Sequence, residues 1–259
     1  MRTRTLRVTG LGLAASSLLL ATACGGAADA EKESAAKKAP ARTATPSPTP
    51  TAAAPLTQRQ AESALLEVKE MPNGWSKDTE MSSTEAGNTE FATGKADKNK
   101  KQCQFLLDGV VGAEQGPKPQ STGIIAFTKS QEGPFVVHGV TGYTEAEATK
   151  LIKGRPVPEA CRTFTADLDG DKATVTYEEL SVPKAGQDSQ GVRLKIVTDD
   201  PEMPPLQYDV AHARVGGAVV SVMEISFTKA DVQTFTESFT KAVAKAEKAG
   251  AAARDGKKG

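Results

Sequence analysis

The strongest constraint on the fold is a series of strand-like runs that lies between segments with helical patterns. In one run Val192, Leu194 and Ile196 alternate with Arg193 and Lys195. This alternation predicts a strand with one buried face and one mostly solvated face. The predicted strands cover residues 122–128, 135–143, 163–168, 172–180, 191–198, 206–215 and 218–227.

Short turn sequences connect two pairs of these runs. Residues 169–171 (Asp-Gly-Asp) and residues 216–217 (Gly-Gly) both lie at hairpin positions. Such short connections require antiparallel pairing. Strands grouped between helices therefore predict an α+β fold, an antiparallel β-sheet packed by about four helices.

Two helices begin with capping boxes. Thr57 with Gln60 begins a helix expected to run to Met71, and Thr144 with Glu147 begins another. The second should end before Gly154, because glycine commonly follows a helix.

Two further helices are expected over residues 103–110 and 228–248. The last is the longest, and we expect this C-terminal helix to pack across the sheet because an apolar stripe follows one side of it. The stripe comprises Val232, Phe235, Phe239, Ala242, Val243 and Ala246.

The N-terminal residues have the features of a secretory signal peptide. Residues 1–23 carry three arginines, no acid and an apolar run over residues 11–23. That run is too short to span a bilayer, which needs about 20 residues. It leads into Cys24 in a sequence that resembles a bacterial lipobox, although Ala21 stands where leucine is usual. We expect cleavage before Cys24 and attachment of acyl chains such as palmitate; an ordinary signal peptide with an incidental cysteine is the alternative.

Composition then predicts the domain order. Residues 24–55 hold the lipidated cysteine and an Ala/Thr/Pro-rich tether that cannot bury apolar surface, so we expect it to be disordered. One α+β domain should follow over residues 56–249, with a disordered tail over residues 250–259. Two acyl chains contribute on the order of 20 kcal/mol of membrane affinity. The expected location is the extracytoplasmic face of the cell membrane.

The charge balance argues against a nucleic-acid partner. Without residues 1–23 the chain keeps about 29 of its 32 basic residues against 32 acidic ones, a net charge near −3. A field this weak does not attract polyanions. The expected partners are the membrane, through the lipid, and a small-molecule or protein ligand outside it, with the domain a monomer.

The cysteine count predicts one disulfide. The chain has three cysteines, and lipidation of Cys24 would leave Cys103 and Cys161 as a pair. In an exported protein two remaining cysteines most simply form a disulfide. Two separately buried thiols are the alternative.

Several short motifs together resemble a known family. They are residues 71–75 (Met-Pro-Asn-Gly-Trp), the helix starting at Cys103, Cys161 before a strand, the hairpin over residues 213–220 and the final long helix. Residues 56–248 thereby resemble the extracellular sensor domain of the PknH-type kinases and related actinobacterial lipoproteins. The resemblance implies an antiparallel sheet with helices, disulfide support and a cleft for a ligand. The chain departs from it in having one possible disulfide where two are expected.

One acidic cluster has part of a metal-site spacing. Asp167, Asp169, Asp171 and Glu178 stand at positions 1, 3, 5 and 12 of a calcium loop. Lys172 occupies the position that requires glycine, and the flanking residues are strand-like. We therefore expect a hairpin turn here and no metal.

Three other residues are weak candidates for ligand binding. His138 and His212 are the two histidines of the chain, both within predicted strands, and each is more simply a half-buried sheet residue. Trp75 follows a helix and either fills the core or lines the mouth of a cleft. The sequence contains no nucleophile elbow, zinc-protease motif or phosphate-binding loop, so we expect no catalytic residue and no cofactor.

These features predict a membrane-anchored binding module with a sensor-like domain that is not an enzyme. A carrier or chaperone for lipid or a cell-wall precursor, with an apolar cavity under the final helix, is the alternative. A wall-active hydrolase is the third possibility. A polar cleft with converging charges would favour the binding module, and an apolar cavity of several hundred Å3 would favour the carrier.

Overall fold

The computed structural model describes residues 54–82, 94–110, 116–168, 170–227 and 229–255. They belong to one compact unit, Pro50–Gly259, which contains its own hydrophobic core. A unit with its own core can fold independently, so it is a suitable fragment for binding experiments. The predicted signal peptide, Cys24, nearly all of the tether and Asp169 lie outside the described residues.

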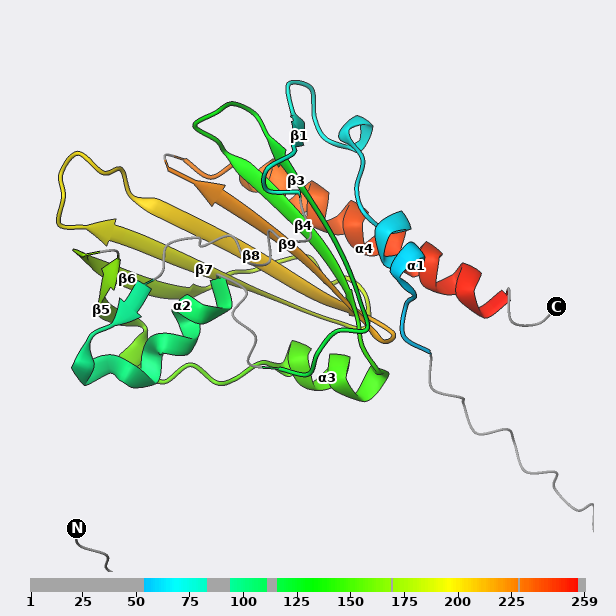
Figure 1. Ribbon diagram of the computed structural model, residues 1–259, viewed down its shortest axis with the longest axis horizontal. Coiled ribbons are helices and arrows are strands. Elements are labelled where there is room, and N and C mark those ends of the chain that lie inside the picture. Colours follow the sequence, from blue (N-terminus) through cyan, green and yellow to red (C-terminus); the bar gives the residue numbers. More distant parts are fainter. Residues whose placement is uncertain (1–53, 83–93, 111–115, 169, 228, 256–259) are drawn as a thin grey trace, which may run out of the picture. The chain divides into compact units, whose positions relative to one another are not determined.

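The described strands form a single antiparallel sheet in the order β1-β3-β4-β9-β8-β7-β6-β5-β2 (Figure 1). All of the predicted strands are present, and the predicted α+β class is confirmed. Strands β1 and β2 were not predicted, because three-residue segments are too short to show alternation. The strands are β1 Ser76–Asp78, β2 Gly94–Ala96, β3 Ser121–Thr128, β4 Phe135–Gly142, β5 Thr163–Leu168, β6 Asp171–Glu179, β7 Asp188–Thr198, β8 Leu206–Val215 and β9 Ala218–Ser226.

Helices lie on both sides of this sheet. Both predicted capping boxes are present, with Thr57 and Thr144 accepting from the backbone three residues on. The α-helices are α1 Gln58–Ser63, α2 Gln104–Val110, α3 Glu145–Lys153 and α4 Val232–Asp255. The described residues also form the short 3-10 helices η1 Val68–Glu70, η3 Lys98–Cys103 and η4 Glu159–Cys161.

The first helix is shorter than its pattern predicts. The expectation of a helix through Met71 is wrong, because α1 ends at Ser63 and the chain re-forms only a 3-10 turn, η1. The backbone N–H of Leu66 donates to Nδ1 of His138 at 3.1 Å. This N–H therefore does not form a hydrogen bond within a helix. Val68, expected on the buried side, is 43% exposed.

The last helix starts later and ends later than expected. Asp231 caps it by accepting from the Thr234 backbone N–H at 3.1 Å, so Val232 is the first helical residue and is 53% exposed. The rest of the predicted apolar stripe is buried. Helix α4 continues to Asp255, so the first residues of the predicted tail are helical.

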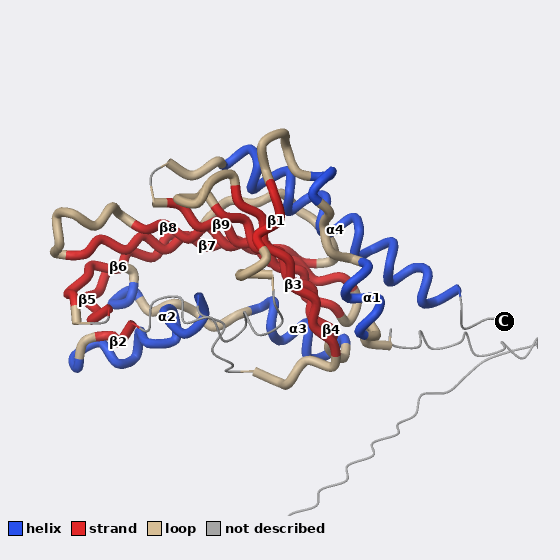
Figure 2. Tube along the Cα trace, turned by 45° about the horizontal axis from the view of Figure 1, so that its top comes forward, coloured by secondary structure: helices blue, strands red, loops and turns tan. Residues whose placement is uncertain are grey.

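The sheet has two apolar faces with separate covers. Helices α4 and α1 cover one, which we call the α4 face, and α2 and α3 lie on the other, the α3 face (Figure 2). The α4 face contains a core that includes Phe127, Val136, Val140, Val222, Phe235 and Phe239. The α3 face contains a second core that includes Phe164, Val175, Leu194, Tyr208 and Ile225.

The α4 face also buries two carboxylates on neighbouring strands. Asp209 of β8 pairs in register with Glu224 of β9, and each side chain is 1% exposed. Arg193 binds Asp209 through two hydrogen bonds of 2.6 and 2.5 Å, and Gln207 donates to the same carboxylate. Glu224 receives one hydrogen bond, from the backbone N–H of Asp231 at 2.5 Å, and its Oε2 has no partner among the described residues.

Burial dominates the protonation of Glu224. It raises the pKa from 4.5 to about 7; the hydrogen bond from Asp231 opposes this rise, while the charges of Asp209 and Asp231 add to it. Arg193 lowers the pKa by a smaller amount. The folded protein therefore binds a proton at a pH where the unfolded chain has released it.

Replacing Glu224 by glutamine should make the protein relatively more stable as the pH rises. The contribution of Glu224 to stability is fully present below pH 4.5 and is lost as the pH rises through about 7. The free energy of unfolding of Glu224→Gln minus that of the wild type should increase by about 3 kcal/mol between pH 4.5 and 8. Urea denaturation at several pH values measures this difference, in which contributions from other groups cancel.

Glu202→Gln, at an exposed loop position, reports the effect of removing a surface carboxylate. The Glu224 effect is taken relative to this control. A difference between Glu224→Gln and wild type that does not change with pH would contradict the buried, protonated state of Glu224.

Candidate functional site

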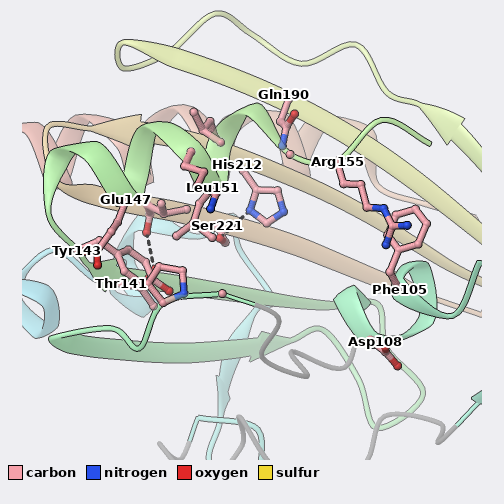
Figure 3. A pocket seen from close by; sticks show the side chains of 16 residues that line it. Phe105, Asp108, Thr141, Tyr143, Glu147, Leu151, Arg155, Gln190, His212 and Ser221 are labelled. Atoms are coloured by element: carbon pink, nitrogen blue, oxygen red, sulfur yellow. Dashed lines mark hydrogen bonds between the residues drawn. The ribbon is translucent and has the colours of Figure 1, made fainter. Parts of the chain in front are cut away.

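A pocket of about 960 Å3 lies on the α3 face of the sheet. Strands β4, β7, β8 and β9 form its floor, α3 forms one wall, and residues of α2 close one end (Figure 3). Its lining residues come from segments more than 100 positions apart in the sequence, so the sheet topology brings them together. Ligand pockets commonly have volumes of about 300 to 1,000 Å3.

The floor carries a row of uncharged polar side chains. Gln190 of β7 pairs with His212 of β8, and His212 pairs with Ser221 of β9, so the three side chains point to the same face. Thr141 and Val219 form the adjacent pair on β4 and β9. Opposite Ser221 lies Gly139, where a Cβ would meet nothing nearer than 4.0 Å, so the floor is open beside the row.

His212 and Ser221 are joined by a hydrogen bond. The His212 Nδ1 lies 2.8 Å from the Ser221 Oγ. Burial lowers the pKa of His212 to about 4, so the imidazole is neutral at physiological pH. A neutral imidazole has one donor and one acceptor nitrogen, and the serine hydroxyl can take either role. The pair can therefore bind either a donor or an acceptor on a ligand.

This Ser–His contact does not form a hydrolase triad. A triad needs a carboxylate that orients the histidine and N–H groups that stabilise an oxyanion. Throughout the described part of the chain, no carboxylate forms a hydrogen bond with His212. Ser221 also lies within strand β9, where backbone N–H groups are used in the sheet. The arrangement is suited to binding.

Helix α3 is held in place at both ends. A Cβ at Gly217 would lie 2.4 Å from the carbonyl oxygen of Tyr143, so glycine is required for the β8–β9 turn to approach the residue before the Thr144 cap. The Tyr143 N–H donates to the Gly217 carbonyl at 2.7 Å. At the other end Gly154 has φ +61°, which ends the helix and directs the chain toward Arg155.

The far end of the pocket depends on a disulfide. Cys103 and Cys161 are bonded as predicted, and both are fully buried. Phe105 follows Cys103 at the start of α2, and Arg155 lies in the segment between α3 and Cys161. The Arg155 guanidinium stacks 4.5 Å from the Phe105 ring centroid. The disulfide therefore links the two segments that form this end.

The candidate ligand-binding and metal-binding residues predicted from the sequence lie in different parts of the structure. His212 lines the pocket, but Trp75 is packed in the core of the α4 face, and His138 is buried on that same face beneath α1. Asp167 accepts from the Gly170 N–H at 2.9 Å in the β5–β6 hairpin, which confirms the predicted turn. Within the described ranges, no group of three or more His, Cys, Asp or Glu side chains could hold a metal ion.

Most pocket residues were not anticipated from the sequence. Gln190 lies before the predicted start of its strand, and Ser221 and Thr141 are ordinary polar positions in strands. A usable signal is a polar residue in a mainly apolar alternation: Ser221 stands among Val219, Met223 and Ile225 in β9, and His212 follows Leu206, Tyr208 and Val210 in β8. The register that places these two residues together is visible only in the folded sheet.

The chain is similar to an extracellular domain of known structure. No family model and no curated protein matches the sequence. A search of solved structures found the extracellular domain of PknH from Mycobacterium tuberculosis, with 14% identity and a TM-score of 0.43, over 75% of this chain and 98% of that chain. This is the type of domain that the sequence motifs resemble, but a similarity of this size carries no argument about function. None of the described helices has the length and hydropathy of a membrane-spanning segment.

Removing the disulfide should destabilise the protein strongly. The Cys103→Ala, Cys161→Ala double variant should lose about 4 kcal/mol of unfolding free energy, because the bond closes a loop of 58 residues and restricts the unfolded chain. Urea denaturation of both proteins at one pH measures the loss. Wild type with and without reductant is the control that involves no substitution. Equal denaturation midpoints would contradict a structural role for the bond.

Proposed function

We propose that this protein is an extracytoplasmic, lipid-anchored module that binds a small ligand in the pocket on the α3 face. The pocket is the observation that carries the proposal: it has ligand-sized volume, a floor of neutral hydrogen-bonding groups, and walls that carry both apolar and charged side chains. Phe105, Leu151 and Val219 supply apolar contacts, while Gln190 and His212 fix orientation. This mixture of apolar surface and a few polar groups is typical of small-molecule sites.

The position of the pocket argues against the carrier predicted as the alternative. That carrier would need an apolar cavity under the final helix. In the structure the space beneath α4 is filled by buried side chains, including Phe235 and Phe239 against Val136 and Val222. The pocket lies on the opposite face and contains charged and neutral polar groups. A small amphipathic molecule fits this lining better than a fully apolar chain.

The proposed anchor depends on Cys24. In the full chain, Cys24→Ser should remove the acyl chains and move the protein from the detergent phase to the aqueous phase on Triton X-114 partitioning. The affinity of two acyl chains is sufficient for stable attachment, and no membrane-spanning helix is present among the described residues. Unchanged partitioning of Cys24→Ser would refute the anchor.

Filling the pocket should abolish ligand binding. Ser221→Trp places a large ring over the open floor beside Gly139. Native mass spectrometry of Pro50–Gly259, incubated with a small-molecule extract of the cells that produce it, should show a bound ligand for the wild type and none for the variant. Thr174→Trp, at an exposed position of β6, is the matched control and should retain the ligand.

Circular dichroism and thermal melting establish that Ser221→Trp is folded. The same bound mass on wild type and on a folded Ser221→Trp would show that the ligand binds elsewhere and would overturn the proposal.

A further inference from the structure

The charged residues of the pocket are not distributed evenly. Four of its lining residues carry charge: Asp108, Glu147, Lys150 and Arg155. Figure 3 shows Arg155 and Phe105 at one end of the pocket and Glu147 near the other. The contacts of each group determine which charge is available to a ligand.

Both acidic side chains are already bound by their own helices. Glu147 accepts from the backbone N–H and the hydroxyl of Thr144 at 2.9 and 2.7 Å, and these bonds lower its pKa. Its charge also faces the positive N-terminal end of α3. Asp108 accepts from the Gln104 side chain at 2.9 Å, and Figure 3 shows it directed away from Arg155.

The two basic side chains of the pocket are Lys150 and Arg155. Neither Arg155 nor Lys150 forms an ion pair with any residue that the structure describes, and both line the pocket. The Arg155 guanidinium stacks on the Phe105 ring. Stacking fixes the plane of the guanidinium but leaves its N–H groups at the edge free to donate.

A stacked guanidinium is a good receptor for a planar or tetrahedral anion. Carboxylates, sulfonates and phosphates accept two parallel hydrogen bonds from it, and a fixed plane reduces the entropy lost on binding. The remaining floor is uncharged, since His212 is neutral and its neighbours are Gln190 and Ser221. A second charge on the ligand would find no counter-ion there.

We propose that the ligand of this pocket is an amphipathic anion, with its acidic group bound by Arg155 and Lys150 and its uncharged body lying along Leu151, Val219 and the neutral floor. The inference rests on the proposed binding function of the pocket and adds the chemical class of the ligand. The acidic group binds beside Phe105, and the body extends toward Ser221.

Two fluorescent probes with the same aromatic frame test this. 8-Anilinonaphthalene-1-sulfonate carries a sulfonate, and N-phenyl-1-naphthylamine is its neutral counterpart. At low ionic strength Pro50–Gly259 should bind the anionic probe about tenfold more tightly, because only the sulfonate accepts charge-assisted hydrogen bonds from the guanidinium. Added salt should weaken the binding of the anionic probe more than the binding of the neutral probe.

Matched variants identify the residue responsible. Arg155→Ala should raise the Kd of the anionic probe about tenfold and leave that of the neutral probe within about twofold. Arg155→Lys, which keeps the charge but lacks the planar fork, should give an intermediate value. Lys153→Ala removes an equal charge from the same helix end but outside the lining, and should change neither Kd.

The outcomes separate this inference from the proposed function. If Ser221→Trp abolishes binding of both probes but Arg155→Ala affects them equally, the pocket stands and the anionic preference is overturned. If Lys153→Ala acts as strongly as Arg155→Ala, a general surface charge is responsible and the inference is also overturned. If Ser221→Trp changes the Kd of neither probe, the pocket is refuted as the binding site, and the inference is refuted with it.

Discussion

The central strands of the sheet are apolar on both faces, and the fold depends on covering each face. Strand β9 has buried residues at alternate positions toward both sides, with Val220 and Val222 on the α4 face and Val219 and Ile225 on the α3 face. One long helix, α4, covers its face together with α1. The α3 face has only the short helices α2 and α3 over it (Figure 2). The pocket lies between these two helices, where their cover is incomplete.

Charged side chains are arranged differently on the two faces of the sheet, and the two faces therefore have different roles. On the α4 face Asp209 and Glu224 are buried side by side with one arginine. Burying two neighbouring carboxylates is costly, and a proton on Glu224, whose pKa is raised by burial, relieves this cost. On the α3 face the two acids of the pocket accept hydrogen bonds from residues of their own helices, and the cations remain accessible. The first arrangement couples stability to pH. The second makes the pocket suitable for an anion, and the Cys103–Cys161 bond stabilises the end where that anion would bind.

The sequence contained enough information for the framework but not for the site. Alternation and hairpin turns predicted every strand longer than three residues, and capping boxes predicted where α1 and α3 begin, because these signals are local. The end of α1 was missed because a side chain distant in sequence, His138, takes the N–H of Leu66. The pocket was missed for a related reason: the placement of Gln190, His212 and Ser221 in one row depends on the register of three strands. The disulfide was predictable because counting cysteines does not require geometry.

The position of a bound ligand tests the proposed pocket most directly. A titration of 15N-labelled Pro50–Gly259 with 8-anilinonaphthalene-1-sulfonate, followed by 1H–15N correlation spectra, locates the site directly. The amides of Leu151, Arg155, His212 and Ser221 should shift together and saturate with one Kd, while those of Phe235 and Phe239 in α4 should stay unchanged. Shifts confined to the α4 face, or no saturable shifts on the α3 face, would contradict ligand binding in this pocket.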